Sequence, residues 1–86
     1  MNNLIEYDKQ PQDFLRKADR HIAKRIMDKI DELLVKETVP HTAKSIVGER
    51  GVFRIRIGDY RVLYRIEYEK NTIAIIKIDK RSKIYK

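Results

Sequence analysis

The 86-residue chain has no cysteine and no long apolar run. Without cysteine it can form neither a disulfide framework nor a thiolate metal site, which is typical of proteins from a reducing compartment. No stretch approaches the roughly 20 apolar residues that a bilayer-spanning helix needs. Residues 1–6 also lack the cationic start and apolar run of a signal peptide. We therefore expect a cytoplasmic protein with no membrane partner.

Glycine and histidine are also scarce. Gly48, Gly51 and Gly58 have the spacing of turns and not that of a phosphate-binding loop. The only histidines, His21 and His41, are not spaced with each other or with carboxylates as metal ligands would be. We expect His21 on the exposed side of a helix and His41 in a loop, and assign a role to neither. The sequence indicates no metal site and no small-molecule cofactor.

The length fits a single domain over residues 1–86, near the lower limit for a core without disulfides or metal. Hydrophobic residues make up 42% of the chain and charged residues 38%, which favours a compact fold over disorder. Twenty Lys and Arg stand against thirteen Asp and Glu, a net charge of +7. So much positive charge on a small surface predicts an anionic partner.

The first half of the chain predicts one strand and two helices. Residues 3–7 form a short mixed run typical of a strand that joins the main sheet. Pro11 followed by Asp13 indicates the first turn of a helix. A second helix is expected from about Asp19, where apolar side chains recur at helical spacing. Its stripe comprises Ile22, Ile26, Ile30 and Leu33 or Leu34, widened by Met27.

After a break at residues 37–42, the hydrophobic period changes to two. Apolar and basic residues alternate over residues 53–57 and again over residues 60–68, on either side of the turn pair Gly58 and Asp59. This pattern strongly indicates a hairpin. A third strand is predicted at roughly residues 72–78. The order strand, helix, helix and three-stranded meander makes the fold class α+β.

The predicted hairpin has two unlike faces. The apolar face carries Phe53, Ile55, Ile57, Tyr60, Val62 and Tyr64, and the other carries Arg54, Arg56, Arg61 and Arg65. Arg56 then lies directly opposite Arg61. Like charges in that position destabilise a sheet, so binding of a polyanion would explain why the arginines are clustered there. A solvated sheet face would produce the same pattern, and Leu63 fits either interpretation.

The third strand has two possible registers. A one-residue slip would bury Lys77. The register that we favour pairs Arg61 with Arg81 and points three apolar side chains to the core, namely Ala74, Ile76 and Ile78. We therefore expect Arg81 beside the arginine cluster.

Two segments resemble the RelE/ParE toxin superfamily, specifically its RelE-type members. They are residues 51–66, GVFRIRIGDYRVLYRI, and residues 78–85, IDKRSKIY, where a basic residue, an arginine and a later tyrosine match the family's closing pattern. With the helical pair, the resemblance covers almost the whole chain. It implies a RelE-like fold, in which an N-terminal strand and a helical hairpin pack on one face of a twisted antiparallel sheet that ends in the meander.

The resemblance also implies a function. The chain would be the toxin of a bacterial or archaeal type II toxin-antitoxin system, acting as an mRNA interferase. RelE-type members are ribosome-dependent, metal-independent endoribonucleases. They cut mRNA in the decoding site by 2′-hydroxyl attack on the adjacent phosphate and so inhibit translation. The implied partners are an acidic RelB-like antitoxin, the ribosome and mRNA.

Catalytic roles carry over by position. Arg61 resembles the arginine that stabilises the phosphorane, Arg81 the one near the leaving oxygen, and Tyr85 the tyrosine that orients or deprotonates the nucleophile. Arg54 and Arg56 replace lysines of RelE. A guanidinium is a poor base, so we expect both to be electrostatic stabilisers, Arg56 among the catalytic residues. The base would be Tyr85, Lys80 or no side chain. The expected RNA-binding residues are Arg54, Arg65, Lys80 and Lys83.

Two other functions stay open at this point. A ParE-like inhibitor of DNA gyrase would share the fold and much of the hairpin around Arg61 without cutting RNA. A non-catalytic RNA-binding module would use the arginine face for phosphate and Tyr68 for base stacking. The presence of both Arg81 and Tyr85 favours the nuclease. The shortage of aromatic residues on the arginine face disfavours the binding module.

Overall fold

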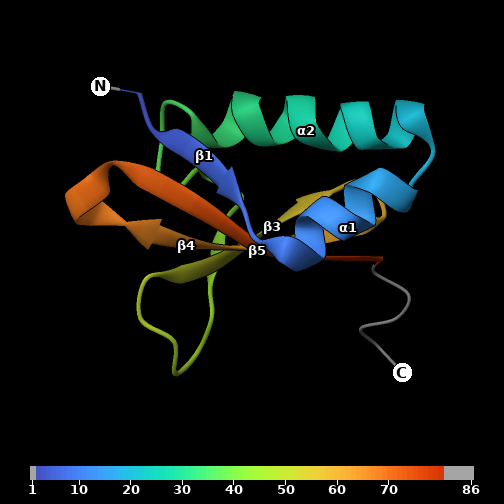
Figure 1. Cartoon of the computed structure of the whole chain (residues 1–86). Coiled ribbons are helices and arrows are strands. Elements are labelled where there is room, and N and C mark those ends of the chain that lie inside the picture. Colours follow the sequence, from blue (N-terminus) through green and yellow to red (C-terminus); the bar gives the residue numbers. More distant parts are fainter. Residues whose placement is uncertain (1, 81–86) are drawn as a thin grey trace.

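The computed structural model describes residues 2–80, and two helices there lie on one side of a five-stranded sheet (Figure 1). The strand order in the sheet is β1-β5-β4-β3-β2. The elements in chain order are β1 (Leu4–Tyr7), α1 (Lys9–Lys17), α2 (Arg20–Leu34), β2 (Lys44–Ser45), β3 (Val52–Ile57), β4 (Tyr60–Glu67), the 3-10 turn η1 (Tyr68–Lys70) and β5 (Thr72–Lys80). This arrangement confirms the predicted α+β class and the three-stranded meander.

The two helices supply one half of the core. The predicted stripe of α2 is confirmed, because Ile26, Ile30 and Leu34 are all buried against the sheet. Met27 does not widen it, since its side chain is 42% exposed. Pro11 lies buried in the first turn of α1, where its missing amide hydrogen costs no helical hydrogen bond. Within residues 2–80, neither helix is long and apolar enough to cross a membrane.

The β3–β4 hairpin has the predicted register. Ile57 lies opposite Tyr60, and Arg56 lies opposite Arg61. Gly58, in the first turn position, has a φ of 57°, which a glycine adopts without strain. A Cβ atom at Gly58 would also collide with the guanidinium of Arg25, which reaches over the turn from α2. The positive φ is the reason that the turn favours glycine, since the flexible, exposed Arg25 side chain can move aside.

The predicted register of β5 is wrong. Arg61 lies opposite Asp79 and not opposite Arg81, because the turn after β4 brings Thr72 opposite Glu67, and a β-bulge between Leu63 and Tyr64 then shifts the pairing by one residue. A bulge inserts one extra residue and resets the alternation of side chains. Lys77 therefore stays exposed while three isoleucines of β5 are buried in the core, namely Ile73, Ile75 and Ile78. Ile76, which was expected in the core, is only half-buried.

The edges of the sheet also differ from the expected all-antiparallel arrangement. β1 joins the sheet as predicted, but it runs parallel to β5, with Leu4 opposite Thr72. At the other edge, β2 pairs antiparallel with β3 inside a segment that carried no strand signal. Lys44 of β2 lies opposite Arg54. This pairing holds the chain after α2 against the sheet.

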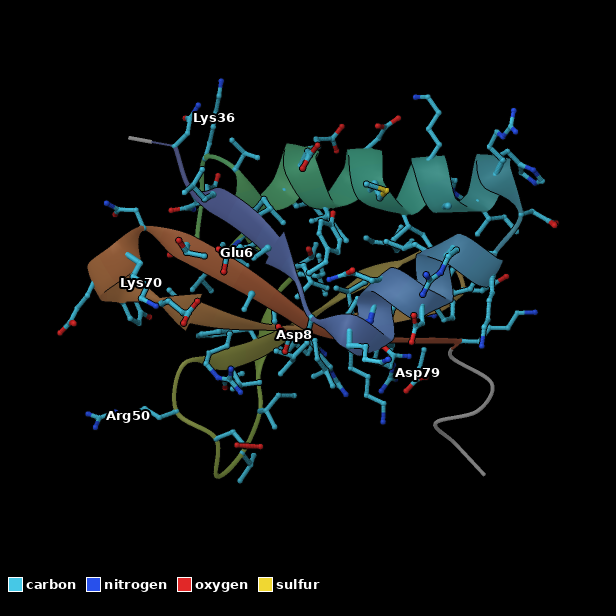
Figure 2. The ribbon with its side chains drawn as sticks, viewed as in Figure 1. Glu6, Asp8, Lys36, Arg50, Lys70 and Asp79 are labelled. Carbon is cyan, nitrogen blue, oxygen red and sulfur yellow. The ribbon has the colours of Figure 1, made fainter. Side chains whose placement is uncertain are left out.

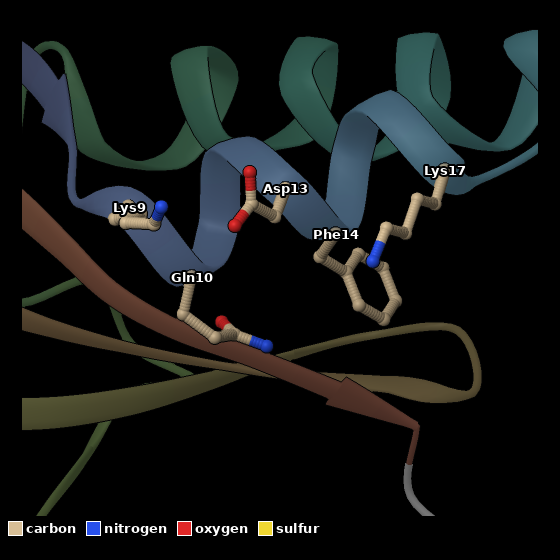
Figure 3. A pocket seen from close by; sticks show the side chains of 5 residues that line it. All are labelled: Lys9, Gln10, Asp13, Phe14 and Lys17. Carbon is tan, nitrogen blue, oxygen red and sulfur yellow. The ribbon is translucent and has the colours of Figure 1, made fainter.

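Gln10 of α1 takes over the pairing of β5 where β1 ends. Its Oε1 accepts a hydrogen bond from the Ile78 N–H at 2.8 Å, and its Nε2 donates to the Ile78 carbonyl at 2.9 Å. The Asp8 N–H donates to the Ile75 carbonyl at 2.9 Å just before it. Figure 3 shows the Gln10 side chain reaching from α1 toward β5. One carboxamide thus satisfies both backbone groups of an edge residue that β1 leaves uncovered.

We expect Gln10→Ala to lower the free energy of unfolding by about 1–2 kcal/mol, because two part-buried backbone groups lose their partner. Urea denaturation would measure the change. Gln12→Ala is the matched control, since Gln12 donates one exposed hydrogen bond, to the Tyr7 carbonyl. Equal losses for the two variants would contradict the role assigned to Gln10.

Candidate nucleic-acid interface

A groove of about 550 Å³ lies beside the arginine-bearing face of the β3–β4 hairpin. One wall is the turn after α2, and the other consists of residues from β3 and β4. The lining residues are His41, Thr42, Ala43, Lys44, Arg54, Ile55, Arg56 and Arg61. Four of these carry a positive charge, and none of the described residues that line the groove is a carboxylate. The groove is therefore suited to a phosphate-bearing ligand.

Three arginines come close together on this surface, which we name the arginine groove after Arg54, Arg56 and Arg61. Arg56 and Arg61 are direct cross-strand neighbours. Partial burial, and after it the charges of Arg54 and Arg56, lower the pKa of Arg61. A guanidinium still remains charged at any ordinary pH, because its pKa lies far above neutral. The cluster is thus a permanent, concentrated positive charge.

The turn wall of the groove is fixed at both ends. The Ala43 N–H donates to the Pro40 carbonyl at 2.9 Å, which closes a tight turn with His41 and Thr42 at its tip. The Tyr64 hydroxyl donates to the Thr38 carbonyl at 2.7 Å from inside the core. Burial raises the pKa of Tyr64, so this hydroxyl stays a neutral donor. Pairing of β2 with β3 holds the other end of the turn.

The structure brings together some of the predicted site residues and separates others. Arg54, Arg56 and Arg61 share the groove. Arg65 lies on the same sheet face but faces Ala74 and does not line the groove. The predicted positions Arg81, Lys83 and Tyr85 lie outside the described residues, and the role of every one of these side chains stays a prediction.

Lys80 lies apart from the arginine groove. It is opposite Tyr60 and lines a different hollow of about 420 Å³ beside α1, together with Phe14 and Asp79. Figure 2 shows Asp79 below α1. The Asp79 carboxylate forms an ion pair with Lys77 at 3.3 Å. Lys80 therefore does not add its positive charge to the arginine groove.

Sequence reasoning missed the turn wall, and above all His41, Thr42 and Lys44. No local motif marks them, because their place depends on β2 pairing with a strand that follows later in the chain. The one available signal was Pro40, which is buried and starts the turn. His41 was expected in a loop, and it is there, but the loop faces the arginines.

Comparison with known families gives a match over nearly the whole chain. Residues 5–85 match the family model described as the ParE toxin of the type II toxin-antitoxin system parDE. The matched range contains the entire arginine groove. It also contains both segments whose resemblance to the RelE/ParE superfamily the sequence indicated.

Individual proteins and structures agree with this match. Toxin RelG of Mycobacterium tuberculosis is 47% identical over 36 residues, which cover 42% of this chain and only 41% of that protein. The crystal structure of the toxin-antitoxin complex RelBE2 from the same organism matches with a TM-score of 0.79 and 25% identity, covering 95% of this chain and 94% of that one. The archaeal RelE-RelB complex from Pyrococcus horikoshii matches with a TM-score of 0.75 and 27% identity, covering 94% of this chain and 97% of that one.

Because opposed arginines repel, we expect Arg56→Gln to raise the urea midpoint of unfolding slightly, and the gain to shrink as salt is added. Denaturation at low and high ionic strength would measure it. Arg65→Gln is the control, since Arg65 lies opposite Val52 and Ala74 and no cation. If both variants changed the midpoint equally at every salt concentration, Arg56 and Arg61 would not be in repulsion.

Proposed function

This chain belongs to the ParE toxin family, and so to the RelE/ParE superfamily of type II toxin-antitoxin toxins, and from that premise we propose that it is a ribosome-dependent endoribonuclease. It would cleave mRNA in the decoding site through attack of a ribose 2′-hydroxyl on the adjacent phosphate. The whole domain, residues 1–86, would act as one unit without a small-molecule cofactor. The observation that carries the proposal is the arginine groove.

The chemistry of the groove fits phosphoryl transfer. A phosphorane gains negative charge on its non-bridging oxygens, and fixed cations aimed at that charge lower the barrier. Guanidinium forks donate two hydrogen bonds to two oxygens, which suits them to a phosphate. Arg61 and Arg56, paired across the hairpin, are proposed to hold these oxygens. Arg54, beside Lys44, would bind the neighbouring phosphate.

The remaining predicted residues take roles from the family resemblance. Arg81 would stabilise the leaving oxygen, and Tyr85 would orient or deprotonate the attacking hydroxyl. Arg65 and Lys83 would bind the RNA backbone outside the groove. Lys80, which lines the hollow beside α1, is better placed to bind a more distant phosphate than to act in the groove. The sequence left Tyr85, Lys80 or no side chain as the base that removes the nucleophile's proton, and Lys80 does not line the groove.

The groove also accounts for the proposed dependence on the ribosome. Its lining holds no aromatic side chain among the described residues, so it offers no platform on which an RNA base could stack. Arginines alone hold a phosphate without fixing the conformation of the neighbouring ribose. The ribosome would supply that conformation by holding the message in the decoding site.

An acidic antitoxin is the proposed inhibitory partner. The RelBE2 structure is a toxin-antitoxin complex, and the Pyrococcus structure is a RelE-RelB complex. The net charge of +7 on this chain is suited to a partner whose carboxylates occupy the arginine groove in place of RNA phosphates. Such a complex would weaken steeply as salt rises, because exposed charges are screened.

Inhibition of DNA gyrase is a second candidate function. The observation that favours it is the family description itself, which names the ParE toxin of parDE. A gyrase inhibitor would need the fold and its cationic face but no catalytic groups. The two candidates therefore differ in whether message is cut.

We expect the purified protein to cut a defined message on programmed ribosomes only at the decoding site, as read by primer extension. Arg61→Ala should slow single-turnover cleavage by about 100- to 1,000-fold, because one stabiliser of the transition-state charge is lost. The double variant Arg61→Ala, Arg81→Ala should show no cleavage above background.

Lys70→Ala is the matched control, since Lys70 is an exposed cation in η1 and lines none of the described hollows. Its cleavage rate should equal that of the unaltered protein. An uncut message, together with inhibition of gyrase supercoiling, would transfer the proposal to the second candidate. Tight binding of RNA without cleavage or gyrase inhibition would leave only a binding module.

A further inference from the structure

The arginine groove contains one described side chain that can exchange a proton near neutral pH, and it is His41. Arginine and lysine are protonated there and cannot accept a proton in that state. A neutral imidazole can accept a proton at one ring nitrogen, and histidine is the side chain that most often serves as a general base. No role for His41 could be predicted from the sequence, because nothing next to it in the chain suggested a site.

The structure positions His41 firmly for a loop residue. Pro40 before it is buried, and the Ala43 N–H closes the turn behind it. The Thr38 carbonyl is held from the core by the Tyr64 hydroxyl. His41 is exposed and lines the groove together with Arg54, Arg56 and Arg61. A phosphate bound by Arg56 and Arg61 would therefore lie in the same groove as His41.

We propose that His41 is the general base of the cleavage reaction, an inference that rests on the proposed nuclease function. The neutral imidazole takes the proton of the ribose 2′-hydroxyl while the 2′ oxygen forms a bond to the adjacent phosphorus. The bond from phosphorus to the 5′ oxygen breaks, and that oxygen leaves with a proton from water. The products are a 2′,3′-cyclic phosphate and a 5′-hydroxyl, and the imidazolium returns its proton to the hydroxide left in solvent.

The charged groups around His41 fit this assignment. Those that share the groove with it are Lys44 of β2, Arg54 and Arg56 of β3 and Arg61 of β4, all cations. They bind the phosphate, and none competes with the imidazole for the proton in the working pH range. His41 is thus the groove residue whose ionisation would set the pH dependence.

The test is single-turnover cleavage of a defined message on programmed ribosomes, measured between about pH 5.5 and pH 8.5, where imidazoles titrate. The cleavage rate of the unaltered protein should rise with pH over the range where imidazoles titrate and then become constant. His41→Gln should be at least about 100-fold slower and should lose that rise, since a general base typically contributes 100- to 10,000-fold. Added imidazole should restore part of the rate of His41→Ala.

His21→Gln is the matched control, because His21 is exposed on α2 and does not line the groove. Thermal unfolding of each variant would show that the fold is intact. If the unaltered protein cleaved the message and His41→Gln had the same rate and pH profile, the role of His41 would be overturned. The proposed nuclease function would not be affected. The same would follow from a slower His41→Gln that kept the full pH rise, together with a His41→Ala that gained nothing from imidazole. An unaltered protein that cut no message would instead overturn the proposed function, and this assignment with it.

Discussion

Alternation of side chains along β3 and β4 is the constraint on which the rest of the structure depends. Every second residue of the hairpin is packed under α1 and α2, including Tyr64 at full burial. A strand cannot bury one set of side chains without turning the other set outward. The core that holds the domain together therefore also brings Arg56 and Arg61 face to face. Folding and the charge of the groove are consequences of one register.

The same constraint separates what could be predicted from what could not. The hairpin register follows from a two-residue turn with Gly58 and a clean period of two, both of which are local signals. The register of β5 is not local, because a bulge allows two alternation patterns to satisfy the core. Pointing Ala74, Ile76 and Ile78 toward the core in one unbroken alternation placed Arg61 beside Arg81. Asp79 lies opposite Arg61 instead, which depends on how the isoleucines of β5 pack against distant parts of the chain.

The candidate site divides in a similar way. Its hairpin half was identified from the arginines alone, because strand periodicity assigns each side chain to a face. Its turn half was missed, because β2 has only two residues and forms only when β3 is present to pair with it. The anchor from Tyr64 to Thr38 joins residues 26 positions apart in the chain. A loop residue such as His41 acquires its surroundings only through contacts of this kind.

A groove built from guanidinium groups has a consequence for how the chemistry must be divided. Fixed cations stabilise a phosphorane equally well at every ordinary pH, so they cannot by themselves make a reaction respond to pH. The pKa of Arg61 is lowered, but a guanidinium remains far from losing its proton near neutrality. Proton transfer therefore has to come from a different kind of group. A titratable side chain on a separate, anchored wall can supply it without weakening the charge that holds the phosphate.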